Sequence, residues 1–459
     1  IKMDKQSVDL GKDSVGKLLL KLSVPAITAQ IINALYNIVD RMYIGHIPEN
    51  GDLALTGLGL CFPVIIIIMA FASLMAQGAA PIAAIHMGKN DNDTAENIMG
   101  NSFIMLIIAA IVITVVFQIF REPILYAMGA SNNTIVYASQ YLRIYLWGTL
   151  PVLLTLGMNM FVNTQGFSKV GMKTVLIGAI SNIILDPIFI YGFDMGVEGA
   201  AYATIISQTI SAVWVMAFLF GKQTKLRLKK KNFRLKKSIL IPALSLGLSP
   251  FVMTGTESLI NIVLNTSLQR TGGDIAVGAM TIISSVMQFV FLPLQGLGQG
   301  AQPIVSYNFG AKNYSRVKET FKLFIKTAIC MTAVVWVVTI FGAPIISKVF
   351  TKSEELINFT VPAMRTYFFM VVAMGVQTSC QQTFLATGQA KISLFLALLR
   401  KIILLAPLAI TFSYIWGSKG VFFAEPVSDL TAATVTFIMF MRNRRYIFEG
   451  LDKKRINIE

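Results

Sequence analysis

The sequence predicts an all-α membrane protein that crosses the bilayer many times, and two observations lead to this prediction. Only 14% of the 459 residues are charged, although soluble domains carry about 25%. Apolar runs of about 20 residues, the length that spans a bilayer as a helix, recur along the whole chain. The strands of a membrane β-barrel would instead show short alternating patterns of about ten residues.

Twelve membrane spans are expected from these apolar runs, in a fold of two six-helix lobes. The expected spans cover residues 15–45, 53–86, 96–119, 134–165, 171–191, 198–220, 239–268, 276–307, 320–346, 358–387, 391–415 and 420–441. The longest polar stretch, residues 222–237, carries nine Lys or Arg and no acid. We therefore expect an N-terminal lobe, a basic linker, a C-terminal lobe and a tail, at residues 1–221, 222–237, 238–441 and 442–459.

The distribution of Lys and Arg predicts the orientation of the chain in the membrane. An even number of spans places both termini on one side, together with every second loop. That side holds 29 of the 39 Lys and Arg, and the opposite side holds six. Because positive charge accumulates in cytoplasmic loops, both termini and the linker are expected in the cytoplasm, with the protein in a bacterial inner membrane.

The two halves of the sequence repeat each other at an offset of about 222 residues. Residues 77–81 (QGAAP) match residues 299–303 (QGAQP), and further matches follow in order. These are Ala54 with Ala276, Gly88 with Gly310, Arg143 with Arg365, Gly166 with Gly388, Lys169 with Lys391 and, after a small gap, Pro25 with Pro250 and Asn37 with Asn261. A duplication of six spans gives parallel halves, so we expect a pseudo-two-fold axis along the membrane normal and a binding cavity between the lobes.

Four polar residues in the first half predict a cation site inside the membrane. Asp40 lies late in the first span, Asn182 and Asp186 lie four residues apart in the fifth, and Thr204 lies early in the sixth. A charge at the bilayer centre costs about 2.5–3.5 kcal/mol, and residues four apart share a helix face. Such an oxygen-rich pocket suits Na⁺ or a proton shared between carboxylates. The alternative is that both acids lie near the outer interface, solvated by water.

The second half carries a different set of charged residues. Glu257 is its main interior acid and has an apolar counterpart in the first span. It could attract a cationic substrate or a second ion, or form a hydrogen bond between helices. We expect a structural role for Glu425 and Asp429, which begin the last span. Arg400 and Lys401 could pair with these acids, extend to the interface or line the cavity.

A substrate cavity is expected between the lobes, lined by polar and adaptable side chains. The candidates are Tyr36, Asn37, Gln208 and Glu257, together with Met158, Met253 and Met287. Met69 and Met374 are further candidates of the same kind. Methionine adapts its shape to varied ligands, although it also fills hydrophobic cores.

Several classes of function are disfavoured by what the sequence contains. No GxxxxGK[ST], HExxH, CxxC or GxSxG motif is present, so we expect neither ATP binding through a P-loop nor an enzyme. The net charge of +16 lies in loops between apolar runs, where anionic lipid headgroups are the expected partner rather than nucleic acid. We expect a monomer without a cofactor, using only a coupling ion.

Four motifs then resemble a known family along residues 10–445. They are residues 39–45 (VDRMYIG), residues 77–81 (QGAAP), residues 182–192 (NIILDPIFIYG) and residues 196–204 (GVEGAAYAT). Together with two six-span lobes, they resemble the multidrug and toxic compound extrusion (MATE) transporters, of the bacterial DinF-like branch.

This resemblance implies export of organic, cationic drugs by alternating access, in exchange for H⁺ or Na⁺. It implies a cation site at Asp40, Asn182, Asp186 and Thr204. Some relatives carry a second site with a glutamate in span seven, matched by Glu257, and an aspartate in span ten. Residues 374–388 contain no acid, so coupling is placed in the N-terminal lobe. A flippase for a lipid or lipid-linked precursor, and a membrane-embedded enzyme or receptor, remain as alternatives.

Overall fold

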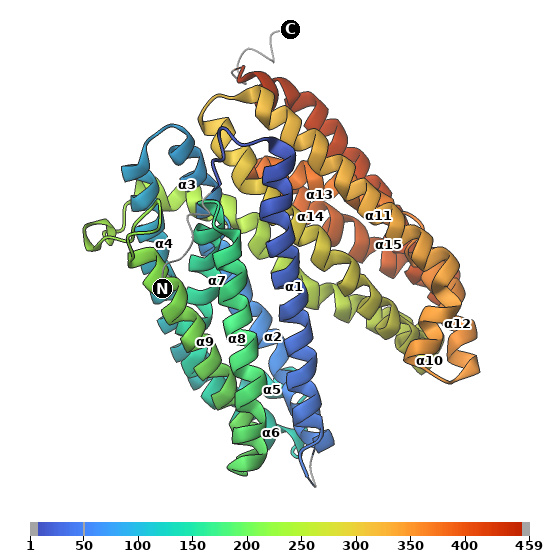
Figure 1. Ribbon diagram of the computed structural model, residues 1–459. Helices are drawn as coiled ribbons and strands as arrows, with labels where there is room; N and C mark the ends of the chain where they lie inside the picture. Colours follow the sequence, from blue (N-terminus) through green and yellow to red (C-terminus); the bar gives the residue numbers. More distant parts are fainter. Residues whose placement is uncertain (1–7, 49–50, 452–459) are drawn as a thin grey trace.

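The computed structural model describes residues 8–48 and 51–451. Every regular element among these residues is a helix. Nine helical segments are long and apolar enough to cross a membrane, and a bent pair of shorter helices adds a tenth. Two of the nine segments each contain two helices that meet at a sharp kink. The described residues therefore hold the twelve spans that the sequence predicts (Figure 1).

The first six spans form the N-terminal lobe. In chain order they are α1 (Val15–Gly45); α2 (Gly51–Ala76) with α3 (Ala79–Gly88); α4 (Asn92–Ile119); α6 (Thr134–Tyr145) with η1 (Leu146–Gly148) and α7 (Thr149–Thr164); α8 (Ser168–Pro187) with the π-helical turn η2 (Ile188–Gly192); and α9 (Gly196–Phe220). A short helix, α5 (Arg121–Ala127), follows α4, and the connection to the second lobe carries the single turn η3 (Lys230–Asn232).

The last six spans form the C-terminal lobe. They are the two arms of α10 (Lys237–Gly310); α11 (Tyr314–Phe350); α12 (Glu354–Tyr367) with α13 (Val371–Ala386), bent by 43°; and α14 (Ala390–Leu398) with the π-helix η4 (Leu399–Leu405) and the two arms of α15 (Ala406–Glu449). The arms meet at Gly273, with φ of 62°, and at Gly417, with φ of 61°. Glycine adopts this left-handed conformation without a steric penalty, so the chain reverses there in very few residues.

The ends of the helices differ from the expected spans by several residues. The helix α4 begins at Asn92 rather than 96, α11 ends at Phe350 rather than 346, and α15 continues to Glu449 rather than 441. Hydropathy marks the part of a helix that lies in lipid, whereas hydrogen bonding continues the helix beyond it. The helices therefore extend past the apolar runs.

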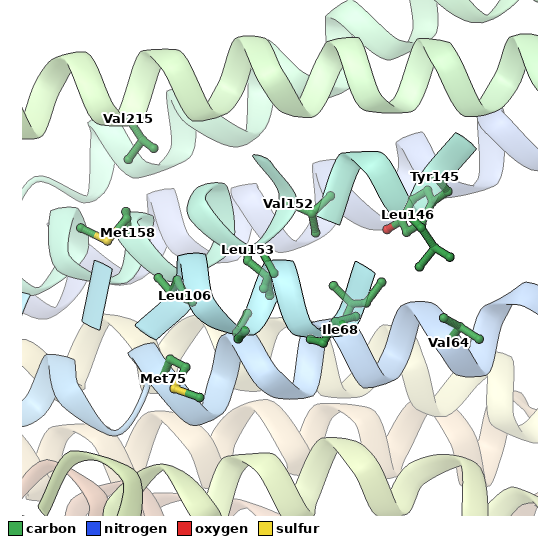
Figure 2. Packing of buried hydrophobic residues seen from close by; sticks show 14 of the residues in the cluster. Val64, Ile68, Met75, Leu106, Tyr145, Leu146, Val152, Leu153, Met158 and Val215 are labelled. Atoms are coloured by element: carbon green, nitrogen blue, oxygen red, sulfur yellow. The ribbon is translucent and has the colours of Figure 1, made fainter. Parts of the chain in front are cut away.

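Each lobe has its own hydrophobic core. In the N-terminal lobe, Ile68 and Met75 of α2, Leu106 of α4 and Leu153 of α7 lie together among buried side chains (Figure 2). A second cluster in the C-terminal lobe includes Leu268 and Met364, both fully buried. Separate cores allow each lobe to behave as a unit.

The basic linker between the lobes is fixed to the N-terminal lobe. Lys229 Nζ forms an ion pair with Glu96 Oε2 at 2.5 Å, and the backbone N–H of Arg227 donates to Glu96 Oε1 at 3.0 Å. The backbone N–H of Lys236 donates to Asn101 Oδ1 at 2.7 Å. We call the end of the molecule that holds this linker the linker face.

The two lobes meet near the linker face through glycines. A Cβ atom on Gly88 would lie 1.9 Å from the carbonyl oxygen of Tyr307, and one on Gly310 would lie 1.9 Å from that of Ile85. Residues 85 and 307, like 88 and 310, are repeat partners, so the two contacts are exchanged as a two-fold axis requires. We call this region the interlobe seam. Away from it, the lobes diverge toward the bottom of Figure 1.

The seam predicts that small residues are required at both glycines. In Gly88→Ala and Gly310→Ala the added methyl group meets backbone rather than a flexible side chain, and such overpacking costs about 1–3 kcal/mol. Each variant should unfold at a lower apparent Tm in detergent. Gly59→Ala is the matched control, because a Cβ at this helical glycine meets nothing within 4 Å. Equal Tm values for all three variants would contradict a tight seam.

Candidate functional site: buried acids between α1 and α8

Two acids from different spans come together inside the N-terminal lobe. Asp40, on the last third of α1, is 9% exposed, and Asp186, near the end of α8, is completely buried. Pro187 follows Asp186 and cannot donate a helical hydrogen bond, and the backbone then widens into η2. Wide π-helical turns of this kind are frequent at functional sites.

The acids and Asn182 form one connected group of polar side chains. Asn182 Nδ2 donates to Asp186 Oδ1 at 3.1 Å, as their spacing of four residues predicts. The side chains of Asp40 and Asp186 lie close enough to interact electrostatically. The structure thus brings together three of the four residues of the predicted cation site.

This group has more acceptor oxygens than donors. Asp40 Oδ1, Asn182 Oδ1 and Asp186 Oδ2 are buried without a hydrogen-bond partner among the described residues. The neighbouring cation, Arg41, is exposed and places its guanidinium 5.1 Å from the ring centre of Phe62. Buried carboxylates without a counter-charge are costly, so the group can take up a proton or a monovalent cation.

Thr204 and three tyrosines surround the acids. Thr204, on α9, donates to the carbonyl oxygen of Ala200 at 2.9 Å and lies near Tyr141. Tyr141 stacks on Tyr145, with ring centres 5.6 Å apart, and Tyr36 lies near Gln208. The sequence reasoning missed Tyr141 and Tyr145. The sequence did offer one signal for these two tyrosines. They lie four residues apart on either side of Arg143, which has a repeat partner in Arg365.

The residues expected to line the substrate cavity are spread over several environments. Met158 is fully buried in the core of the N-terminal lobe, and Met287 packs against that of the C-terminal lobe. Asn37 is exposed and donates to the carbonyl oxygen of Asn33 at 2.7 Å. Of the three methionines proposed for the cavity, only Met253 lines the cavity described next.

A cavity of about 110 Å³ lies mainly in the C-terminal lobe. Its wall combines polar and apolar side chains, and Gln77 and Met160 are its contribution from the N-terminal lobe. The polar lining residues of the C-terminal lobe are Ser249, Thr254, Gln295, Gln299, Gln302, Gln377, Thr378, Gln381, Gln382, Ser393, Arg400 and Lys401.

Five charged residues form a network beside this cavity. Arg400 pairs with Asp429 at 2.8 Å and with Glu425 at 3.2 Å, and these three side chains are almost completely buried. Lys401 pairs with Glu257, whose side chain is 58% exposed. The sequence left open whether Arg400 and Lys401 pair with acids, extend to the interface or line the cavity. In the structure, both cations pair with acids and also line the cavity.

The network lies on the spans of its lobe that correspond to the spans of the acid pair in the other lobe. Its residues come from spans seven, eleven and twelve, the repeat counterparts of spans one, five and six. Among residues 8–48 and 51–451, no group of three or more His, Cys, Asp or Glu side chains is placed to hold a metal ion. The two lobes thus carry polar sites of different composition on equivalent spans.

Two six-helix lobes with polar sites inside the membrane define the class of two-lobed membrane transport proteins. The profile of the MatE family matches residues 25–188 and 251–411. The chain therefore belongs to the MatE family and is a multi-pass membrane protein. The family predicted from the sequence is confirmed.

Relatives and solved structures match nearly the whole chain. A multidrug export protein MepA from Staphylococcus haemolyticus is 24% identical over 443 residues, covering 96% of this chain and 97% of the relative. A MepA from Staphylococcus aureus is 25% identical over 445 residues, with 95% and 96% covered. A MOP superfamily transporter from Pyrococcus furiosus has a TM-score of 0.89 and 24% identity, with 97% and 99% covered. A MATE structure in the bent conformation reaches 0.90 at 24% identity, with 96% and 98% covered.

The buried network predicts a strong effect of removing Arg400. Arg400→Met leaves Glu425 and Asp429 buried without their counter-charge, which costs about 3–5 kcal/mol. We expect a large fall in apparent Tm in detergent. The triple variant Arg400→Met, Glu425→Gln and Asp429→Asn should recover most of this loss.

The matched control for this measurement is Arg143→Met. Arg143 pairs with Glu198 at 3.0 Å, but its side chain is 57% exposed, and such surface pairs contribute at most about 1 kcal/mol. A fall in Tm no larger for Arg400→Met than for Arg143→Met would contradict the buried network.

Proposed function

We propose that this chain is a secondary active multidrug exporter that exchanges organic compounds for H⁺ or Na⁺ by alternating access. The observation that carries the proposal is the pair of buried acids between α1 and α8, with oxygens that lack donors. The related MepA proteins bear the name of multidrug export proteins. That name favours drug export over the alternative of a lipid flippase.

The acid pair provides a way to couple an ion to the conformation of α1. Without an ion, the carboxylates of Asp40 and Asp186 repel each other, and a bound proton or Na⁺ removes this repulsion. Asn182 orients Asp186 through its hydrogen bond, and the Thr204 hydroxyl lies on the neighbouring α9 as a further oxygen ligand. Ion binding therefore favours the conformation in which α1 and α8 are close.

The position of α1 connects this site to the other lobe. Its first half, with Leu18, Leu19 and Leu22, packs in a cluster with Leu294 and Leu297 of α10. Its second half carries Asp40 against α8. A movement of α1 driven by the ion site thus changes the contact between the lobes. Drug and ion then affect each other's binding reciprocally.

The arrangement of the lobes corresponds to one state of an alternating-access cycle. The interlobe seam closes the linker face, and the lobes diverge on the other side (Figure 1). With the linker and both termini in the cytoplasm, as the Lys and Arg distribution predicts, this state is outward-facing. We place the transporter in a bacterial inner membrane, as a monomer.

The test of this function is export driven separately by a pH gradient and by a Na⁺ gradient. Purified protein in liposomes should move ethidium under one of the two gradients, and Asp40→Asn should reduce this flux at least 10-fold, because the neutral amide cannot exchange a cation. Asp194→Asn is the matched control. It is the same substitution at an exposed acid whose φ of 54° asparagine tolerates.

Coupled flux through Asp40→Asn at the level of the control would refute the assignment of the ion site. If the unaltered protein moves neither ethidium nor other drugs under either gradient, the exporter proposal itself fails. Lipid flipping would then be the next activity to measure.

A further inference from the structure

We propose that the cavity in the C-terminal lobe binds the acidic end of carboxylate-bearing organic compounds, with Lys401 as the ionic partner and the glutamines as hydrogen-bonding partners. The inference rests on the proposed function, because it names a substrate class for that transporter. It differs from the cationic substrate expected from the sequence.

The charged residues on the cavity wall are the first reason to expect an anionic ligand. Among the described residues, the lining includes Arg400 and Lys401 and no Asp or Glu. Glu257, which suggested a cationic substrate, is absent from the lining and largely exposed. A cation entering this cavity would find no carboxylate among its described lining residues, whereas an anion could contact the ammonium of Lys401 directly.

The two cations differ in how firmly their charges are already paired. Arg400 forms ion pairs with two acids whose side chains are 5% and 3% exposed, so its charge is already engaged in buried ion pairs. Lys401 is 13% exposed and pairs with one exposed acid, Glu257. A substrate carboxylate could therefore replace Glu257 on the Lys401 ammonium. The lysine would remain paired, and Glu257 would be released to water without a burial cost.

The glutamines supply neutral hydrogen-bonding groups around this ammonium. Within the part of the chain that the structure describes, the side chains of five lining glutamines make no hydrogen bond to protein: Gln295, Gln299, Gln302, Gln377 and Gln382. Each amide offers two donors and an acceptor. Donors directed at an anion add to the ionic contact, and the acceptors suit N–H or O–H groups on the ligand.

The size of the cavity indicates how much of a ligand it holds. Its volume of about 110 Å³ is below the range of about 300–1,000 Å³ for pockets that enclose a drug-sized molecule. The cavity therefore accommodates one end of a substrate, a carboxylate and the ring that bears it. The remainder would extend toward the space between the diverging lobes.

The pseudo-two-fold symmetry allows the polar groups of the two lobes to be compared span by span. On equivalent spans, the N-terminal lobe presents acids that need a cation, and the C-terminal lobe presents a lysine that can accept an anion. The two lobes thus favour ligands of opposite charge. A proton or Na⁺ and an acidic substrate can bind separately, without competing for the same side chains.

The experiment compares norfloxacin, a carboxylic acid, with its methyl ester, which differs only in lacking the ionisable carboxyl group. Binding of both to the purified full-length protein in detergent is measured by their fluorescence, and export is measured in liposomes. We expect the acid to bind at least 10-fold more tightly than the ester. Lys401→Met should abolish this preference, with ester affinity changed less than twofold.

Two further variants sharpen the test. Glu257→Gln removes the competitor for Lys401, so affinity for the acid should rise severalfold. Lys419→Met, at an exposed lysine outside the cavity lining, is the matched control and should keep the preference for the acid.

The proposal is overturned if the unaltered protein binds acid and ester equally or binds neither. It is also overturned if Lys401→Met weakens both probes to the same extent. Preferential binding of the acid without gradient-driven export would instead uphold the cavity assignment and reject the proposed function, so the two failures are distinguishable.

Discussion

The cost of a charge inside the membrane is the constraint on which the polar architecture of this protein depends. A charge at the bilayer centre is so unfavourable that it must find a partner or remain in contact with water. The C-terminal lobe supplies a partner from its own side chains, because Arg400 forms ion pairs with both Asp429 and Glu425. The N-terminal lobe does not, because Asp40 and Asp186 meet each other rather than a cation. One lobe thus pairs its buried acids with a cation of its own, whereas the other leaves its buried acids without one.

Duplication places the acid pair and the Arg400 network on equivalent spans and also builds the contact between the lobes. The exchanged contacts of Gly88 with Tyr307 and of Gly310 with Ile85 bring backbone against backbone. Such contacts are rigid where they form but involve little side-chain interlocking. A seam of this kind can close firmly at one face while leaving two independent cores to move as units. α1 packs against both lobes, which makes it the element through which an ion site in one lobe can influence the other.

Much of the candidate ion site could be predicted because its residues obey local rules. Asn182 and Asp186 share a helix face at a spacing of four, and their hydrogen bond follows directly. The substrate side was less accessible to such reasoning. Glu257 looked like a group facing a ligand, yet its pairing with Lys401 depends on two spans separated by 144 residues. Tyr141 and Tyr145 were missed because aromatic residues in a span more often face lipid or core.

The sequence alone determined the number of spans, the duplication and the family, because apolar length, repeat spacing and motif identity are properties of the chain itself. It also identified Asp40, Asn182 and Asp186 as polar groups that lipid would not tolerate unaccompanied. Only the tertiary structure decided which acids meet cations and which remain unpaired, and which face of the molecule the lobes close. These features depend on contacts between helices distant in sequence, and helical periodicity does not specify which helix lies opposite a given face.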